Sequence, residues 1–308
     1  MRGNIIFRVA VMTLLLARPA RAQTVTDLFD DTVLQEIRLT IDPADWQSLH
    51  EKYLDNGYYR CRFEWGGMTL ENVGVRSRGS GTRNPIKPNL GFDFSKYVST
   101  QRFLSLKSLV TRNFAQDPSV MREWLTLKLF TRMGLPSQRE AFAKIYVNGA
   151  YAGLFLLVEP IDKRYLAARF GEDTGYLYEG HFVEPPFLFE WRGAAVETYL
   201  PSIFEPKTHE DQPEGERLVE LMRRVNEASD AEFTRQVGEL LDLDELMAYL
   251  GVEQYVTETD GFLGYAGLTN FYLYRRMSDN RFVILPWDKD HGFAIAERSI
   301  WENTPGNI

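Results

Sequence analysis

The sequence predicts an α+β fold with a strand-rich N-terminal part and a helical C-terminal part. Runs rich in β-branched and aromatic residues alternate with Gly, Asp and Asn before residue 160. Apolar residues then recur at helical spacing from about residue 210. With 308 residues, 44% of them hydrophobic, the chain has enough apolar material for one large domain or two lobes.

Residues 1–22 have the layout of a cleavable secretory signal. A basic Arg2 precedes an apolar run over 9–17, and Ala20-Arg21-Ala22 places small residues at the expected cleavage point. The apolar run is shorter than the ~20 residues that a membrane-spanning helix needs, so we expect no stable membrane span after cleavage. The expected location of the mature domain, 23–308, is therefore the periplasm, the cell envelope or the extracellular space.

The mature chain is acidic. Removal of the first 22 residues takes away four arginines and leaves 31 basic against 43 acidic residues, a net charge of −12. This charge disfavours nucleic acid as a partner. It favours a basic, serine-containing protein segment instead, because complementary charge aids encounter. The single Cys61 and the scattered histidines form no zinc-binding pattern, so any metal is expected to have oxygen ligands.

Three strands are expected early in the mature chain, at 34–39, 58–65 and 70–76. A Gly/Ser/Arg-rich stretch follows at 76–85. It suits a solvated loop and equally a loop that faces an anion, because glycines let backbone N–H groups approach a phosphate and Arg78 supplies charge. Lys87 is then expected to open a further strand that ends at residue 94.

A helix is predicted after these strands. Asp117-Pro118 is typical of an N-cap followed by proline in the first turn, with Glu123 early in the helix and Gly134 just beyond its end. Three apolar residues recur every four positions and are expected to face the core: Met121, Leu125 and Leu129.

A hairpin is predicted next, because Asn148-Gly149 separates strand-like runs at 142–147 and 151–158. Glu159-Pro160 ends the second run. We expect the boundary between the N-terminal part, about 23–160, and the C-terminal part, about 161–308, at this point.

Polar residues flank two further strand-like runs near the C-terminus. Asn270 directly precedes the run at 271–275, and Asp288 lies just past the run at 281–285. If the two runs pair as a hairpin, both side chains lie at the same end of the sheet. Hard oxygen ligands of this kind suit Mg²⁺ or Mn²⁺ bridging substrate phosphates. Asp290 is an alternative or supporting metal ligand.

These residues together suit phosphoryl transfer. That reaction needs metal-held phosphates, a group that orients the acceptor hydroxyl, and positive charge near the transferred group. Asp260 is the candidate for the hydroxyl, and Lys87 and Arg78 are the candidates for the phosphates. Taken singly, Asp260-Gly261 also suits a turn, and an Asp-x-Asp also suits a calcium loop. The order of strand lysine, helix glutamate, hairpin, helices, Asp, Asn and Asp is that of a protein kinase.

Several motifs over residues 70–293 occur together in one order: Arg76-x-Arg78-Gly79, Lys87, Asp117-x-Ser119, Arg122-Glu123, Val147-Asn148-Gly149-x-Tyr151-x-Gly153, Glu159-x-Ile161-Asp162, Asp260, Asn270 and Pro286-Trp287-Asp288-x-Asp290. This combination resembles the CotH kinase family. The resemblance implies a two-lobed atypical protein-kinase-like fold in a secreted enzyme that transfers phosphate from ATP to protein serines or threonines. It further implies that Asp260 is the catalytic-loop aspartate and that Asp288 is a Mg²⁺ ligand.

Two further residues are assigned to the nucleotide site within this resemblance. Glu123 is chosen as the helix carboxylate that orients Lys87, with Arg122 and Asp117 as competitors. Glu159 stands where a kinase hinge meets adenine, but hinge contacts are mostly made by the backbone, which favours a structural role for its side chain.

The sequence also departs from ordinary kinases, since it has neither Gly-x-Gly-x-x-Gly nor His-Arg-Asp. It ends sixteen residues after Gly292, where relatives are expected to continue, so the helical lobe is expected to be incomplete at its C-terminus. Two alternatives remain: a non-catalytic coat or surface scaffold, and a metal-dependent hydrolase or nucleotidyl transferase that uses the same aspartates.

Overall fold

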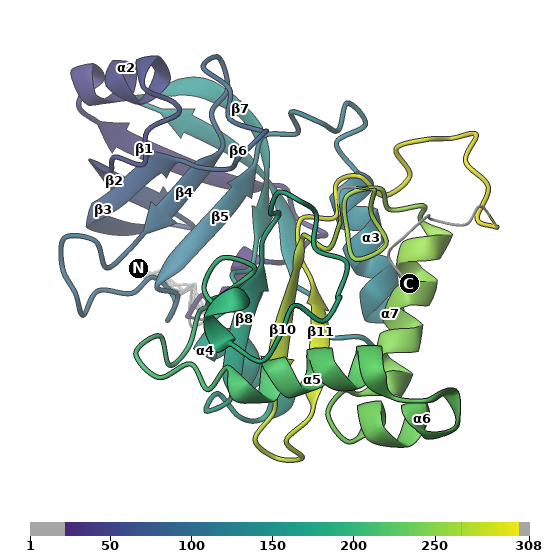
Figure 1. Ribbon diagram of the computed structural model, residues 1–308. Helices are drawn as coiled ribbons and strands as arrows, with labels where there is room; N and C mark the ends of the chain where they lie inside the picture. Colours follow the sequence, from purple (N-terminus) through teal and green to yellow (C-terminus); the bar gives the residue numbers. More distant parts are fainter. Residues whose placement is uncertain (1–21, 266, 302–308) are drawn as a thin grey trace, which may run out of the picture.

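A computed structural model describes residues 22–265 and 267–301, and Figure 1 shows the path of the chain. The predicted signal segment lies outside the described residues except for Ala22. The described chain is α+β, as predicted, and is built on two sheets. No helix within these residues combines the length and the apolar character needed to cross a bilayer.

The N-terminal part is a closed barrel of seven strands in the order β1-β2-β3-β4-β5-β7-β6. The strands are β1 (Gln35–Ile41), β2 (Tyr59–Trp65), β3 (Met68–Ser77), β4 (Leu90–Asp93), β5 (Ser108–Arg112), β6 (Glu140–Val147) and β7 (Ala150–Val158). Neighbouring strands are antiparallel except β1 and β6, which pair in parallel with Ile37 opposite Ile145. Closure leaves the barrel without a free edge along these strands.

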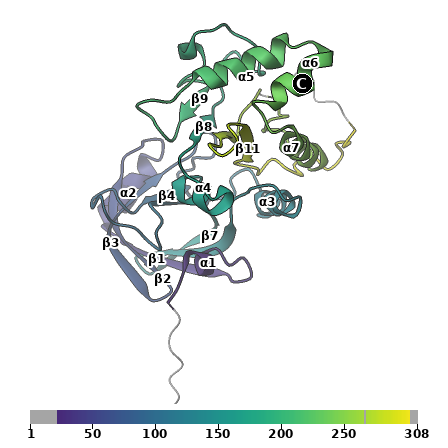
Figure 2. The ribbon, with the colours of Figure 1, turned by 90° about the horizontal axis from the view of Figure 1, so that it is seen from below.

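Aromatic side chains fill the barrel. The Phe63 ring lies 5.3 Å from the Phe92 and Phe94 rings and 5.0 Å from the Phe103 ring, with edge-to-face geometry in each case. Such contacts add to the stabilisation from burial of apolar surface. Two short helices, α1 (Val25–Leu28) and α2 (Pro43–Glu51), lie against the outside of the barrel (Figure 2).

Most strand predictions for this part are confirmed. β1, β2 and β3 occupy the three predicted positions, and β6 and β7 form the predicted hairpin. Asn148 and Gly149 take positive φ values of 51° and 84° in its turn, as a tight two-residue hairpin loop requires. The strand predicted to open at Lys87 is wrong at its start, because β4 begins at Leu90 and Lys87 lies in the preceding loop.

Helix α3 (Arg122–Arg132) is the predicted helix, but it begins later than predicted and packs through another face. Asp117 Oδ2 accepts a hydrogen bond from the Arg122 N–H at 2.8 Å, so Asp117 caps the helix from outside it. Met121 and Leu125 are each 42% exposed, which contradicts the predicted core face. The buried residues of α3 are Glu123, Thr126, Leu127 and Phe130. Because two of these four buried residues are polar, the spacing of apolar residues in the sequence does not indicate this core face.

The C-terminal part has a four-stranded sheet in the order β11-β10-β8-β9. Its strands are β8 (Tyr176–Gly180), β9 (Phe204–Pro206), β10 (Phe271–Arg275) and β11 (Phe282–Pro286). Its helices are α4 (Lys163–Phe170), α5 (Glu216–Glu227), α6 (Asp230–Gly238) and α7 (Leu243–Tyr255), with a 3₁₀ turn at Val196–Thr198. The helices at 216–255 gather on the side of this sheet away from the barrel (Figure 2). β8 and β9 were not predicted.

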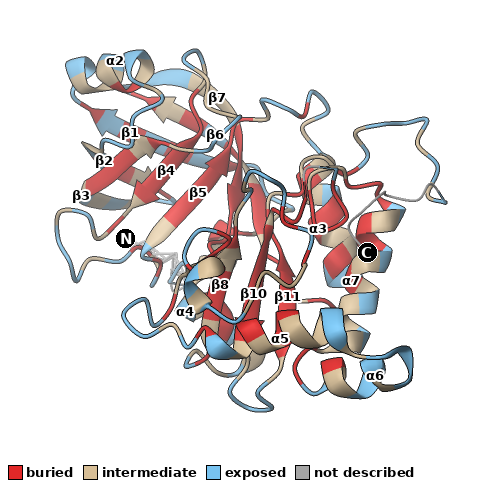
Figure 3. Cartoon of the chain, viewed as in Figure 1, coloured by how far each residue is buried: buried red, intermediate tan, exposed pale blue. Residues whose placement is uncertain are grey.

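A third apolar cluster joins the two parts. Val110, Leu156 and Val158 of the barrel pack with Tyr272 and Leu285 of the second sheet, and all five are buried. Figure 3 shows buried residues running along β5, β7, β8, β10 and β11. This contact fixes the end of the β10–β11 hairpin beside the end of β5.

Candidate active site

The β10–β11 hairpin brings Asn270 and Asp288 to one end of the second sheet, as predicted. Phe271 pairs with Pro286, and the Trp287 N–H donates to the Asn270 carbonyl at 3.3 Å, so the pairing extends toward both polar residues. Asn270 and Asp288 have positive φ values of 56° and 52°. Asn and Asp tolerate this left-handed conformation better than other side chains except glycine, which favours these residue types at the two strand ends.

Asp260 lies beside Asn270 although ten residues separate them in sequence. The Asn270 side-chain amide donates to the Asp260 carbonyl at 2.6 Å. Glu258 Oε1 accepts from the backbone N–H groups of Thr259 and Asp260, each at 3.0 Å. Among the described residues, no hydrogen-bond donor contacts the Asp260 carboxylate. The backbone of Asp260 is therefore held on both sides while its carboxylate remains available.

Arg112, at the end of β5, is the site residue that sequence reasoning missed. Its guanidinium donates to both oxygens of Glu123, with Nε–Oε2 at 2.9 Å and Nη2–Oε1 at 3.0 Å. Its Nη2 also lies 3.1 Å from Asp288 Oδ1. Burial alone would lower the pKa of Arg112, but the carboxylates of Asp288 and Glu123 raise it above its usual value. Arg112 thus links the barrel, α3 and the β10–β11 hairpin through one buried charge.

A second arginine lies near Arg112. The guanidinium carbons of Arg78 and Arg112 lie 5.8 Å and 4.9 Å from the centre of the Trp287 ring, respectively. Nη1 of Arg78 is buried with no hydrogen-bond partner among the described residues. Burial and the charge of Arg112 lower the pKa of Arg78. An anion beside both guanidinium groups would therefore stabilise their charged forms.

Asp290 adds a buried carboxyl group to the same region. Burial, with the nearby charges of Asp288 and Glu123, raises the pKa of Asp290 to about 8. The acidic groups around Arg112 thus exceed the positive charge that faces them. A divalent cation would relieve this repulsion and favour the ionised form of Asp290.

A cavity of about 950 Å³ lies between the barrel and the second sheet, next to these residues. Val110 and Arg78 line it from the barrel, and Tyr272 and Trp287 line it from the sheet. The connection at Pro160–Arg164 closes one side. Most of its charged lining is basic: Arg78, Arg102, Lys107, Lys163, Arg164 and Lys207, against Asp162, Glu179, Glu210 and Asp211. In size and charge the cavity suits a nucleoside triphosphate.

Lys87 does not occupy the position predicted for it. Its ammonium donates to the Asn113 carbonyl at 3.0 Å and lies over the Phe155 ring at 4.8 Å. The predicted pairing of Lys87 with Glu123 is therefore wrong, because Arg112 holds that carboxylate. Asp117 and Arg122, the competitors considered for Glu123, instead form the cap of α3. The signal that was overlooked is an arginine at the end of the strand that directly precedes the helix.

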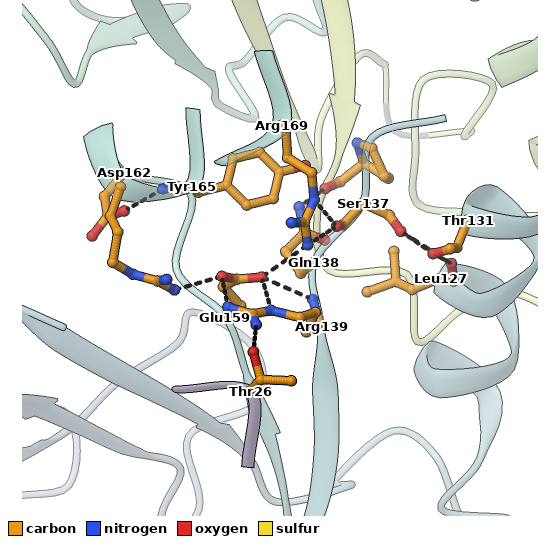
Figure 4. A network of polar contacts seen from close by, with 12 residues as sticks. Thr26, Leu127, Thr131, Ser137, Gln138, Arg139, Glu159, Asp162, Tyr165 and Arg169 are labelled. Carbon is orange, nitrogen blue, oxygen red and sulfur yellow. Dashed lines mark hydrogen bonds and ion pairs between the residues drawn. The ribbon is translucent and has the colours of Figure 1, made fainter. Parts of the chain in front are cut away.

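Glu159 lies at the predicted connection between the two parts, but its side chain does not take part in a nucleotide site. Its side chain is fully buried and accepts hydrogen bonds from Arg139, Arg164 and Arg169, as Figure 4 shows around its carboxylate. Burial opposes ionisation, but these guanidinium groups lower the pKa of Glu159. The carboxylate thus ties β7 to β6 and α4 and does not reach the cavity. Assigning it to nucleotide binding is wrong, although the backbone just after it, Pro160–Ile161, does line the cavity.

A second set of potential metal ligands lies at the basic side of the cavity. Ligand atoms of Glu179, His181 and Glu205 lie within 4.8 Å of one another. The Lys207 ammonium already bridges the two carboxylates, at 2.7 Å from Glu179 and 2.6 Å from Glu205. Lys207 therefore supplies positive charge to both carboxylates of this set without an ion.

Arg112 of the barrel pairs with Glu123 of α3, and Asp260, Asn270 and Asp288 lie on the second lobe. This arrangement is that of a kinase-like α+β protein. The chain belongs to the CotH kinase protein family, whose model matches residues 75–307. It is 25% identical over 253 residues to inner spore coat protein H of Bacillus subtilis (strain 168), in a match that covers 82% of this chain and 67% of that relative.

Proposed function

We propose that this protein transfers the γ-phosphoryl group of ATP to serine or threonine residues of a protein substrate. The observation that carries the proposal is the assembly of Asp260, Asn270 and Asp288 at one end of the second sheet, facing the Arg112–Glu123 pair. Phosphoryl transfer depends on positioning and charge, and these residues supply both beside a cavity of suitable size.

Each of these residues has a role in the proposed reaction. The substrate hydroxyl oxygen forms a bond to the γ-phosphorus while the bond from that phosphorus to the β–γ bridging oxygen breaks, and ADP leaves. The hydroxyl proton passes to the Asp260 carboxylate, which has no donor among the described residues. Arg78 and Arg112 bind phosphate oxygens, and Glu123 orients Arg112.

Mg²⁺ or Mn²⁺ fits the acidic residues of this site. Asp288, Asp290 and the Asn270 amide oxygen would hold the ion, because the Asn270 amide nitrogen is already engaged with the Asp260 carbonyl. Such an ion would supply positive charge that offsets the negative charge of the phosphates during transfer. The raised pKa of Asp290 supports this assignment, since repulsion from Asp288 contributes to it.

The substrate is proposed from the net charge of the chain, and the location is proposed from the name of the relative. The acidic surplus of the chain favours a basic, serine-containing protein segment. The relative is named as an inner spore coat protein. We therefore propose a location in a cell envelope or coat, reached by export through the predicted N-terminal signal.

The name of the relative also favours a second candidate, a coat or surface scaffold that has a kinase-like fold and no activity. The two differ in what the acidic residues must do. A scaffold does not need a partner-free Asp260 carboxylate, nor an excess of carboxyl groups around Arg112.

The test is incubation of residues 23–308 with γ-labelled ATP and Mg²⁺ or Mn²⁺, alone and with a basic serine-containing peptide. Asp260→Asn and Asp288→Ala are expected to abolish protein labelling. Asp279→Asn is the matched control, because Asp279 lies at the opposite end of the same hairpin and pairs with Arg276. Release of phosphate or AMP without protein labelling would favour a hydrolase or nucleotidyl transferase. No labelling and no metal-dependent nucleotide binding would favour the scaffold.

A further inference from the structure

Glu253, in α7, is a fully buried carboxylate that holds the segment at residues 258–264, here called the Asp260 loop. Its Oε2 accepts from the Leu263 N–H at 2.8 Å, and its Oε1 accepts from the Phe262 N–H at 3.2 Å. The Glu253 carbonyl also accepts from the Glu258 N–H at 2.9 Å. One helical residue thus holds the loop at its start and just beyond Asp260.

Lys289 lies between Asp288 and Asp290 in the segment at residues 287–292, here called the Asp288 loop. Its side chain is fully buried, and its ammonium donates to Glu253 Oε1 at 2.6 Å. The same ammonium lies 5.7 Å from the centre of the Tyr249 ring. Lys289 points into the lobe, where Glu253 and Tyr249 of α7 enclose its ammonium. It therefore does not meet phosphate directly.

The Asp260 loop packs closely against the Glu253–Lys289 ion pair, which leaves no room for another side chain to replace it. A Cβ atom at Gly261 would lie 2.6 Å from Glu253 Oε1 and 2.8 Å from Lys289 Nζ. The remaining side-chain contact between the loops is weaker, because the Thr259 hydroxyl and His291 Nδ1 lie 3.2 Å apart in a half-buried position. The ion pair of Glu253 and Lys289 is thus shorter than the Thr259–His291 contact, and it joins the Asp288 loop to the residue that holds the Asp260 loop.

We propose that Glu253 and Lys289 are positioning residues, and that their ion pair sets the spacing between the Asp260 carboxylate and the Asp288 and Asp290 carboxylates. The inference rests on the proposed phosphoryl transfer. A proton acceptor and metal ligands that sit on separate loops must keep a fixed separation, because small misplacements of reacting groups lower the rate steeply. Because Glu253 also binds the Phe262 and Leu263 amides, it links this spacing to the rigid helix α7.

The test uses the double variant Glu253→Gln/Lys289→Met. Removing one partner would leave an uncompensated buried charge, whereas replacing both leaves none and should preserve folding. The Gln side chain introduced by Glu253→Gln keeps one acceptor oxygen, which can bind the Phe262 N–H or the Leu263 N–H but not both, and it has lost its link to residue 289. We expect faster amide hydrogen exchange throughout the Asp288 loop, faster exchange in the Asp260 loop only at whichever of Phe262 and Leu263 loses its acceptor, and an about 10- to 100-fold fall in kcat with KM for ATP changed less.

The matched control is Asp242→Asn/Arg276→Gln. This pair joins the N-terminus of α7 to the far end of the β10–β11 hairpin at 2.8 Å. This control variant should lose an ion pair of similar length, between side chains that are each 16% exposed, without changing exchange in either loop or kcat. Wild-type kcat reports on the proposed function, while amide exchange reports on the loops without any activity. Unchanged exchange in the Asp288 loop, or faster exchange with an unchanged kcat, would overturn the inference.

Discussion

Loss of the Arg112 guanidinium should destabilise the fold strongly, because two carboxylates depend on it. In Arg112→Met, Glu123 loses all three hydrogen bonds that Arg112 donates to it, while its side chain is only 4% exposed. Asp288 loses a contact of 3.1 Å, but its side chain is 30% exposed and water can solvate it. Breaking a buried ion pair by removing one partner costs about 3–5 kcal/mol. We expect Arg112→Met to fall in this range, and nearly all of the loss to come from Glu123.

The double variant Arg112→Met/Glu123→Gln distinguishes the effect of the broken Arg112–Glu123 ion pair from the effect of lost packing around the Arg112 side chain. It leaves no buried unpaired charge at Glu123, so its free energy of unfolding should recover most of what Arg112→Met loses. The assay is urea unfolding of the wild type, both single variants and the double variant, followed by tryptophan fluorescence. A loss below about 1 kcal/mol in Arg112→Met would refute the reasoning, because it would mean that Glu123 is neutral or solvated in the folded chain.

Three further predictions concern other parts of the chain. Burial raises the pKa of Glu245 to about 7, so the stability that Glu245 contributes is full below pH 4.5 and is lost as the pH rises through 7. Between these pH values, urea unfolding should show the wild type losing about 1–3 kcal/mol of unfolding free energy relative to Glu245→Gln. Gly261→Ala should lower the free energy of unfolding by about 1–3 kcal/mol, because its Cβ would lie 2.6 Å from Glu253 Oε1; a neutral result in the same assay would contradict the close packing of the Asp260 loop. Burial raises the pKa of the Cys61 thiol to about 12, so a thiol reagent should modify it only at the rate of unfolding, and rapid modification of the native protein would contradict the barrel.

The parts of the fold that the sequence predicted correctly are those with local signals. Asn148-Gly149 has the turn chemistry of a tight hairpin, and the runs before and after residue 276 pair as expected. Asn270 and Asp288 could be placed together because hairpin pairing relates them directly. Pairings between distant segments were not visible: β1 beside β6, and β8 between β10 and β9, depend on contacts that no short pattern encodes.

The site was predicted less completely because charged residues look alike in sequence. Arg112 follows a strand-like run, as a solvated arginine would, and only the packing of α3 makes it the partner of Glu123. Lys87 stood at a plausible position in the order of elements but lies in a loop over Phe155. Glu159 occupies the expected connection, yet three arginines that converge from β6 and α4 hold its side chain there.

The central claim is that Asn270, Asp288 and Asp290 hold a divalent cation beside the phosphates of ATP. The most direct test is a crystal structure with Mn²⁺ and a non-hydrolysable ATP analogue, with data collected for anomalous scattering from manganese. We predict an anomalous peak within coordination distance of Asp288 and the Asn270 amide oxygen, with phosphate oxygens beside Arg78 and Arg112. A manganese peak at Glu179, His181 and Glu205 instead, or an analogue bound away from Arg112, would contradict the claim.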